Sequence, residues 1–132
     1  MEDLVLKTFE QAAERGDDIT ADIYRRYYQR CPKAEVLMGH VDPHMQGRMM
    51  EEVLNLLMTE PGELPDGYLA FETATHASYG VLLAMYPDLL HAVRETVRAA
   101  VGDDWNDACD QAWDQRTAAL LAHIAAAAPS VP

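Results

Sequence analysis

One histidine, His76, is the residue of this sequence best placed for cofactor chemistry. It stands in the run Thr75-His76-Ala77-Ser78-Tyr79-Gly80-Val81, which ends a predicted helical segment and turns the chain at a glycine. A neutral imidazole can give a transition metal one nitrogen while its other nitrogen is held one turn upstream, here by the carbonyl of Glu72. Structural zinc needs four protein ligands, and no second ligand stands near His76 at the required spacing.

Iron that is already held by a macrocycle needs fewer ligands from the protein. Haem needs one proximal side chain and an apolar slot, and this chain can supply both. A lone histidine can equally be a hydrogen-bonded structural residue, and an all-α protein without a cofactor is the corresponding alternative. Whether His76 ligates haem or is a structural residue has to be judged from the other segments of the chain.

The composition indicates one acidic domain covering residues 1–132. Hydrophobic residues make up 49% of the chain, which is enough for one core. Ten basic and 22 acidic residues give a net charge of −12, which disfavours nucleic acid and membranes as partners. Two cysteines make no disulfide framework, no apolar stretch is long enough to cross a bilayer, and the acidic amino terminus does not resemble a signal peptide. We therefore expect a cytoplasmic protein.

The apolar residues recur with helical periodicity along nearly the whole chain, and no strand pattern interrupts them. They predict about seven helices: one ending at Gly16, one from about residue 19 to 31, a short one over 32–38, one over 44–59, a short one ending at His76, a long one over 81–101, and a last one from Trp105 to Ile124. Residues 125–132 should fray. Helices of such unequal length, one of them short and angled, indicate steep crossings around an enclosed space rather than a simple bundle.

Five segments together carry a family resemblance. They are residues 8–17 (TFEQAAERGD), 23–32 (IYRRYYQRCP), 46–50 (QGRMM), 76–81 (HASYGV) and 112–113 (AW). In order and spacing they resemble bacterial single-domain globins related to the haem domain of flavohaemoglobins, over nearly the whole chain. The resemblance implies an all-α globin fold around haem b, iron protoporphyrin IX.

The resemblance also implies roles for single residues. His76 falls on the proximal ligand of the haem iron, and Tyr86 on a tyrosine that packs beneath the haem. Tyr24 falls on a distal tyrosine whose hydroxyl donates to bound dioxygen. Gln46 falls on a distal glutamine, and Met50 on the apolar position one turn further on. One or two donors aimed into a dry pocket would slow the release of dioxygen. For Tyr24 the alternative is a core tyrosine with a satisfied hydroxyl.

Two more residues belong to the implied haem slot. Val81 closes the motif that contains His76. Met38 stands where globins press a phenylalanine against the haem, and its thioether can fill that space or ligate iron.

The distal side has alternatives. The turn before the 44–59 helix is shorter than in flavohaemoglobins, and a shift of one residue would direct Met45 and Met49 at the iron instead of Gln46 and Met50. His44, or else Met45, is a candidate internal sixth ligand, which would give a six-coordinate haem suited to electron transfer or to redox or gas sensing. The alternative for His44 is a solvated residue in the first helical turn.

On the proximal side this sequence lacks one carboxylate that flavohaemoglobins have. Those proteins carry a glutamate in the last helix that polarises the ligating imidazole, whereas residues 121–128 here contain no carboxylate. Glu72 is a candidate substitute, although a contact of the imidazole with the Glu72 carbonyl is the expected arrangement.

The resemblance implies reversible binding of dioxygen, nitric oxide or carbon monoxide, for oxygen binding, storage or transport. The enzymatic alternative is conversion of nitric oxide to nitrate. No FAD-binding segment follows in this sequence, so we expect redox turnover to need a separate reductase. A homodimer through apolar faces of the last two helices is a further expectation.

Overall fold

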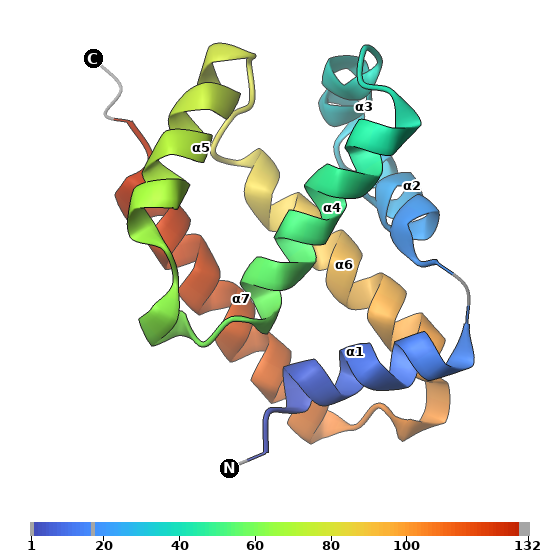
Figure 1. Cartoon of the computed structure of the whole chain (residues 1–132). Helices are drawn as coiled ribbons and strands as arrows, with labels where there is room; N and C mark the ends of the chain where they lie inside the picture. The colour runs from blue at the N-terminus through green and yellow to red at the C-terminus, as the bar shows by residue number, and fades with distance from the viewer. Residues whose placement is uncertain (1, 17, 130–132) are drawn as a thin grey trace.

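All regular structure in the computed structural model, which describes residues 2–16 and 18–129, is helical (Figure 1). Within these residues there are seven α-helices and two short 3-10 helices: α1 (Leu4–Arg15), α2 (Thr20–Arg30), α3 (Pro32–Met38), α4 (Pro43–Met58), η1 (Pro61–Glu63), α5 (Asp66–Ser78), α6 (Met85–Val101), η2 (Gly102–Asp104) and α7 (Asp107–Ala127). The prediction of an all-α protein is confirmed. The tail predicted to fray is helical as far as Ala127, and residues 130–132 lie outside the described part of the chain.

Short polar side chains and prolines set the helix starts. The side chains of Asp3, Asp42 and Asn106 accept hydrogen bonds from the backbone N–H groups three residues later, which satisfies donors that the first helical turn leaves unpaired. Pro32 and Pro43 occupy the first turn of α3 and α4, where a missing N–H costs nothing. These signals explain why the predicted boundaries of α3 and α4 agree with the structure to about one residue.

The start of α6 differs from the prediction. Gly80 has a φ of 96°, a conformation that other residues rarely adopt, and it ends α5 with a turn. Residues 81–84 continue as a non-helical turn in which the Leu82 N–H lies 3.5 Å from the Met85 Sδ. The long helix therefore begins at Met85 rather than at Val81.

The first and last helices are joined through Trp113. Its side chain is completely buried, and its ring lies 5.2 Å from the Phe9 ring, centroid to centroid. The indole Nε1 donates to the Thr8 hydroxyl at 2.9 Å, and that hydroxyl donates to the Val5 carbonyl at 2.8 Å. This chain of bonds satisfies every polar group that the contact buries.

Helix packing leaves one face of the molecule open. The helix α1 packs on α6 and α7, α2 packs on α6 and α3, and α5 packs on α7. In Figure 1, α4 and α5 spread apart from the short segment that joins them. Among the described residues these two helices make few contacts with each other.

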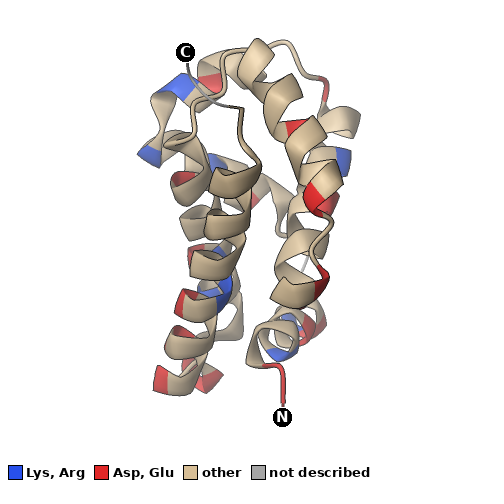
Figure 2. Cartoon of the chain, turned by 90° about the vertical axis from the view of Figure 1, so that its left-hand side faces the viewer, with Lys and Arg blue, Asp and Glu red and all other residues tan. Residues whose placement is uncertain are grey.

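The surface is acidic but mixed. Figure 2 shows Lys and Arg scattered among the more numerous Asp and Glu rather than gathered into one patch. Several of the arginines pair with aspartates, among them Arg94 with Asp110 at 2.8 Å and Arg116 with Asp3 at 2.9 Å. Among the described residues, none of the helices has both the length and the apolar character needed to span a lipid bilayer.

The large exposed hydrophobic side chains lie outside α6 and α7, and the expected dimer contact through these two helices stays a prediction. In the described part of the chain the large exposed hydrophobic side chains are Leu6, Val36, Met45, Phe71, Tyr79, Leu82 and Leu83. None of them belongs to α6 or α7, because the apolar faces of these two helices are used in the core.

The Thr8–Trp113 hydrogen bond should contribute measurably to stability. Thr8→Val keeps the shape of the side chain but leaves the buried indole N–H unpaired, so we expect a loss of about 1–3 kcal/mol in the free energy of unfolding, measured by urea denaturation. Thr117→Val is the matched control, because the Thr117 hydroxyl bonds only a carbonyl of its own helix. Equal effects of the two substitutions would contradict this role.

Candidate functional site

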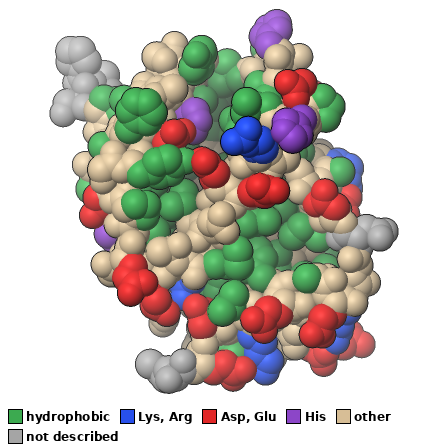
Figure 3. Space-filling view, viewed as in Figure 1, with side chains coloured by type: hydrophobic (Ala, Val, Ile, Leu, Met, Phe, Trp, Pro, Cys, Tyr) green, Lys and Arg blue, Asp and Glu red, His purple; other side chains and the backbone are tan. Residues whose placement is uncertain are grey.

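A cavity opens between α4 and α5, with α6 and α7 behind it (Figure 3). Its volume is about 170 Å³ and its mouth is open, so it is smaller than the roughly 300–1,000 Å³ of a typical ligand pocket, and a large ligand would extend out through the mouth. Its walls are mostly apolar, and most of them come from these four helices; α2, α3 and the segment after α5 supply the rest. The cavity is therefore the enclosed space that the unequal helices predicted.

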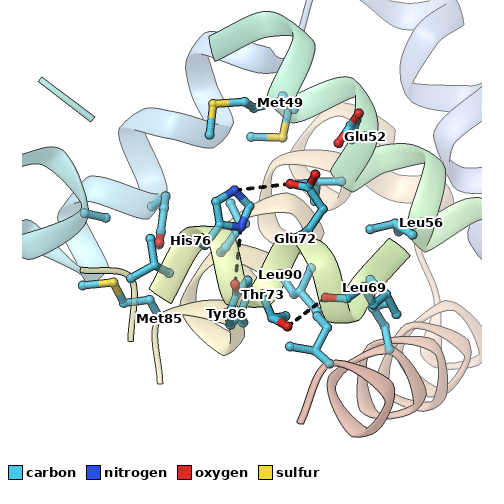
Figure 4. A pocket seen from close by; sticks show the side chains of 18 of the residues that line it. Met49, Glu52, Leu56, Leu69, Glu72, Thr73, His76, Met85, Tyr86 and Leu90 are labelled. Atoms are coloured by element: carbon cyan, nitrogen blue, oxygen red, sulfur yellow. Dashed lines mark hydrogen bonds and ion pairs between the residues drawn. The ribbon is translucent and has the colours of Figure 1, made fainter. Parts of the chain in front are cut away.

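His76 lies on the α5 wall of this cavity, as predicted (Figure 4). Its Nδ1 is 3.5 Å from the Tyr86 Oη, and its Nε2 is 3.7 Å from a carboxylate oxygen of Glu72. The expected contact with the Glu72 carbonyl is not the one found, since the Tyr86 hydroxyl takes that place. The imidazole is thus held between two helices, with Tyr86 on α6 and Glu72 on its own helix.

Four tyrosines reach the cavity, and all keep their phenol protons at neutral pH. Burial raises the pKa of Tyr24 to about 12. Burial also raises the pKa of Tyr27 and of Tyr86, and the negative charge of Glu72 adds to the effect on Tyr86. The pKa of Tyr68 is raised by burial and by its hydrogen bond to the Glu52 carboxylate.

The two predicted distal donors contact each other, and of the two only Tyr24 also lines the cavity. The Tyr24 hydroxyl donates to the Gln46 carbonyl at 2.7 Å. The Gln46 side chain donates from Nε2 to the Val41 carbonyl at 2.9 Å and is not part of the cavity wall. The structure thus brings Tyr24 and Gln46 together, but it gives Gln46 a place in the turn before α4 and not in the cavity.

The cavity-facing stripe of α4 begins at Met49. Met49, Glu52, Val53 and Leu56 line the cavity at helical spacing, together with the almost completely buried Met50. Met50 of the original expectation and Met49 of the shifted register therefore both line the cavity, whereas Met45 of the shifted register is 45% exposed.

The predicted sixth ligand His44 is not in the cavity. It lies exposed in the first turn of α4 and does not line the wall. Its position is the solvated one that was the alternative for this residue.

Of the remaining predicted residues, Met38, Val81 and Tyr86 all line the cavity. Sequence reasoning missed Tyr27, although its helical spacing from Tyr24 could have placed it on the same face. It also missed Glu52, Tyr68 and Met85, for which the sequence holds no signal beyond membership of an amphipathic helix.

The rim of the cavity between α4 and α5 is acidic. Glu52 and Glu72 line it, the Tyr68 hydroxyl donates to Glu52, and no Lys or Arg is among the lining residues. In the described part of the chain, no three His, Cys, Asp or Glu side chains come together in a way that could hold a metal ion. A single imidazole on an apolar wall suits a metal whose other ligands arrive with it.

Comparison with known proteins adds no assignment. No family model matches the chain, and no curated protein is significantly similar to it.

The burial of Tyr24 should make the fold sensitive to alkali. A tyrosine ionises near pH 10 in the unfolded chain but at about 12 here, so between these values the unfolded state binds fewer protons and the free energy of unfolding falls as the pH rises. We expect a shallower fall in Tyr24→Phe, measured by urea denaturation from pH 9 to 12 (roughly the span of this titration). Tyr79→Phe removes an exposed phenol and should leave the slope unchanged. An unchanged slope in Tyr24→Phe would contradict the burial argument.

Proposed function

We propose that this chain is a haem-binding protein of the globin type, with His76 as the axial ligand of haem b, that binds small diatomic ligands reversibly. One observation supports this most strongly: a single imidazole, next to a tyrosine hydroxyl from another helix, lies on the wall of a mostly apolar cavity between α4 and α5.

The protonation of His76 suits this role. When Nδ1 carries the proton and donates it to the Tyr86 hydroxyl, Nε2 keeps its lone pair for a metal. The Glu72 carboxylate is 3.7 Å from Nε2, which is too long for a strong hydrogen bond and leaves that nitrogen available. Tyr86 therefore acts as the group that selects the tautomer and orients the ring.

The cavity walls fit a flat apolar group with polar edges. Val53, Leu56 and Leu90 are among the many side chains that exclude water from its interior. Haem also carries two propionates, and Glu52 and Glu72 disfavour negative charge at the rim that they share. We therefore expect the propionates to leave the cavity away from this rim.

Haem, when bound, would supply an iron that binds dioxygen, carbon monoxide or nitric oxide. The chain's own part is to give that iron one nitrogen, to keep water away with apolar walls, and to hold the phenols of Tyr24 and Tyr27 protonated beside the cavity. The five motif segments support this proposal, since their order and spacing resemble those of bacterial single-domain globins.

The axial role of His76 can be tested by reconstitution. The purified chain supplied with haemin should give a stable haem protein that binds carbon monoxide when ferrous, and His76→Ala should lose most of its affinity for haem. His44→Ala is the matched control, because this exposed histidine is off the cavity and its loss should leave the spectra unchanged. A colourless wild-type protein, or a His76→Ala variant with unchanged spectra, would overturn the proposal.

Tyr86 should act on the haem only through His76. Tyr86→Phe keeps the ring but removes the oxygen that faces Nδ1, so we expect weaker haem binding by about tenfold or more and a lower iron–histidine stretching frequency in the ferrous protein, measured by resonance Raman spectroscopy. Tyr79→Phe should change neither value, since Tyr79 is 74% exposed. An unshifted stretching frequency in Tyr86→Phe would contradict the orienting role.

A further inference from the structure

We infer that the Met49 thioether is a second, internal axial ligand of the haem iron, on the side opposite His76. The inference rests on the proposed haem site. It makes the cavity a histidine–methionine site, in which an external diatomic ligand has to displace a side chain of the protein.

The polar groups expected on this side are already engaged. Tyr24 donates its hydroxyl proton to the Gln46 carbonyl at 2.7 Å, and the Gln46 amide donates to the Val41 carbonyl at 2.9 Å. His44, exposed in the first turn of α4, is not part of the cavity wall. The predicted distal residues therefore leave the α4 side of the cavity without a nitrogen ligand and without a donor from Gln46.

Methionine side chains are the remaining candidate ligands on the cavity wall. Four thioethers line the cavity, from Met38, Met49, Met50 and Met85. A thioether is a soft, uncharged ligand that binds haem iron, and a methionine is flexible enough to reach a nearby metal. The question is which of the four can do so.

Two of the four are held by the fold. The Met85 sulfur is 3.5 Å from the Leu82 N–H and accepts from it, so it is tied to the turn before α6. Met50 is 1% exposed and belongs to the core cluster. Neither side chain can turn toward the middle of the cavity without breaking these contacts.

Met49 is better placed than Met38. It starts the cavity-facing stripe of α4, the helix that faces the His76 helix across the cavity, and Figure 4 shows it on the α4 side above the His76 ring. It is only partly buried and makes no hydrogen bond, so its rotamers are not fixed by the core. Met38 lies on the short helix α3, packed against the core cluster.

A thioether ligand changes what the site is suited for. Histidine–methionine ligation favours ferrous iron and raises the reduction potential, as in electron-transfer haem proteins. Binding of carbon monoxide or dioxygen would then be limited by dissociation of Met49, which fits electron transfer or gas-responsive signalling better than simple oxygen storage.

The experiment compares wild type, Met49→Leu and Met38→Leu, each reconstituted with haemin. Leucine keeps the apolar volume of either side chain but cannot ligate iron. In the wild type we expect a low-spin ferric spectrum with the weak far-red band of thioether ligation. Met49→Leu should lose that band, become high-spin, show a lower midpoint potential and bind carbon monoxide at least tenfold faster, whereas Met38→Leu should keep the wild-type spectrum.

The outcomes separate this inference from the proposed function. A protein that takes up haem through His76 but is high-spin in the wild type, or that keeps the thioether band in Met49→Leu, overturns the Met49 assignment and leaves the haem proposal standing. Loss of the band in Met38→Leu alone also overturns it. A chain that takes up no haem contradicts the proposed function itself.

Discussion

The site depends on one packing constraint: α4 and α5 are neighbours in sequence but are supported mainly by other helices. The helix α5 packs on α7, where the Thr73 hydroxyl bonds the Leu69 carbonyl at 2.8 Å and lies 3.3 Å from the Ala127 carbonyl. The helix α4 packs on α1 and α7, and Arg116 of α7 donates to the Leu57 carbonyl near the end of α4. Because each helix is fixed from behind, their facing sides stay apart and a cavity persists in a small core. An apolar cavity of this size forfeits packing energy, which a bound ligand would restore.

The turn between α5 and α6 determines how the His76 ring is oriented at this cavity. His76 lies in the last turn of α5, and Gly80 reverses the chain with a positive φ. A Cβ on Gly80 would also come within 3.4 Å of the Leu37 side chain, so the turn lies close against α3. The chain then returns as α6 at a distance that puts the Tyr86 hydroxyl beside the His76 Nδ1. Local backbone geometry therefore fixes the orientation of the ring, and no contact from a distant part of the chain is needed.

Much of the fold, but less of the site, was predictable from the sequence. Apolar periodicity, glycines and prolines located the helices, and the motif around His76 identified a residue on the cavity wall. The rotation of α4 could not be predicted, because Met49, Met50, Val53, Leu54, Leu56 and Leu57 form so wide an apolar stripe that several faces are compatible with burial. A rotation of this helix by one residue exchanges Met50 for Met49 as the residue that faces the cavity, and the structure has both of them on the cavity wall. The same limitation explains why Glu52 and its partner Tyr68 were missed.

The hydrogen bond from Tyr24 to Gln46 holds the start of α4 in place. A tyrosine with a raised pKa keeps its proton, and here it donates to the backbone of the first turns of α4 rather than into the cavity. With the Gln46 amide also bonded to Val41, the bond ties α2 to the start of α4 and holds that turn. This holds the start of α4, where Gln46 is used, while Met49 lies about one turn further along the helix and lines the cavity. Two residues whose types suggest stabilisation of a ligand thus bond the backbone instead, which is why the proposed second ligand is sought among the thioethers of the cavity wall.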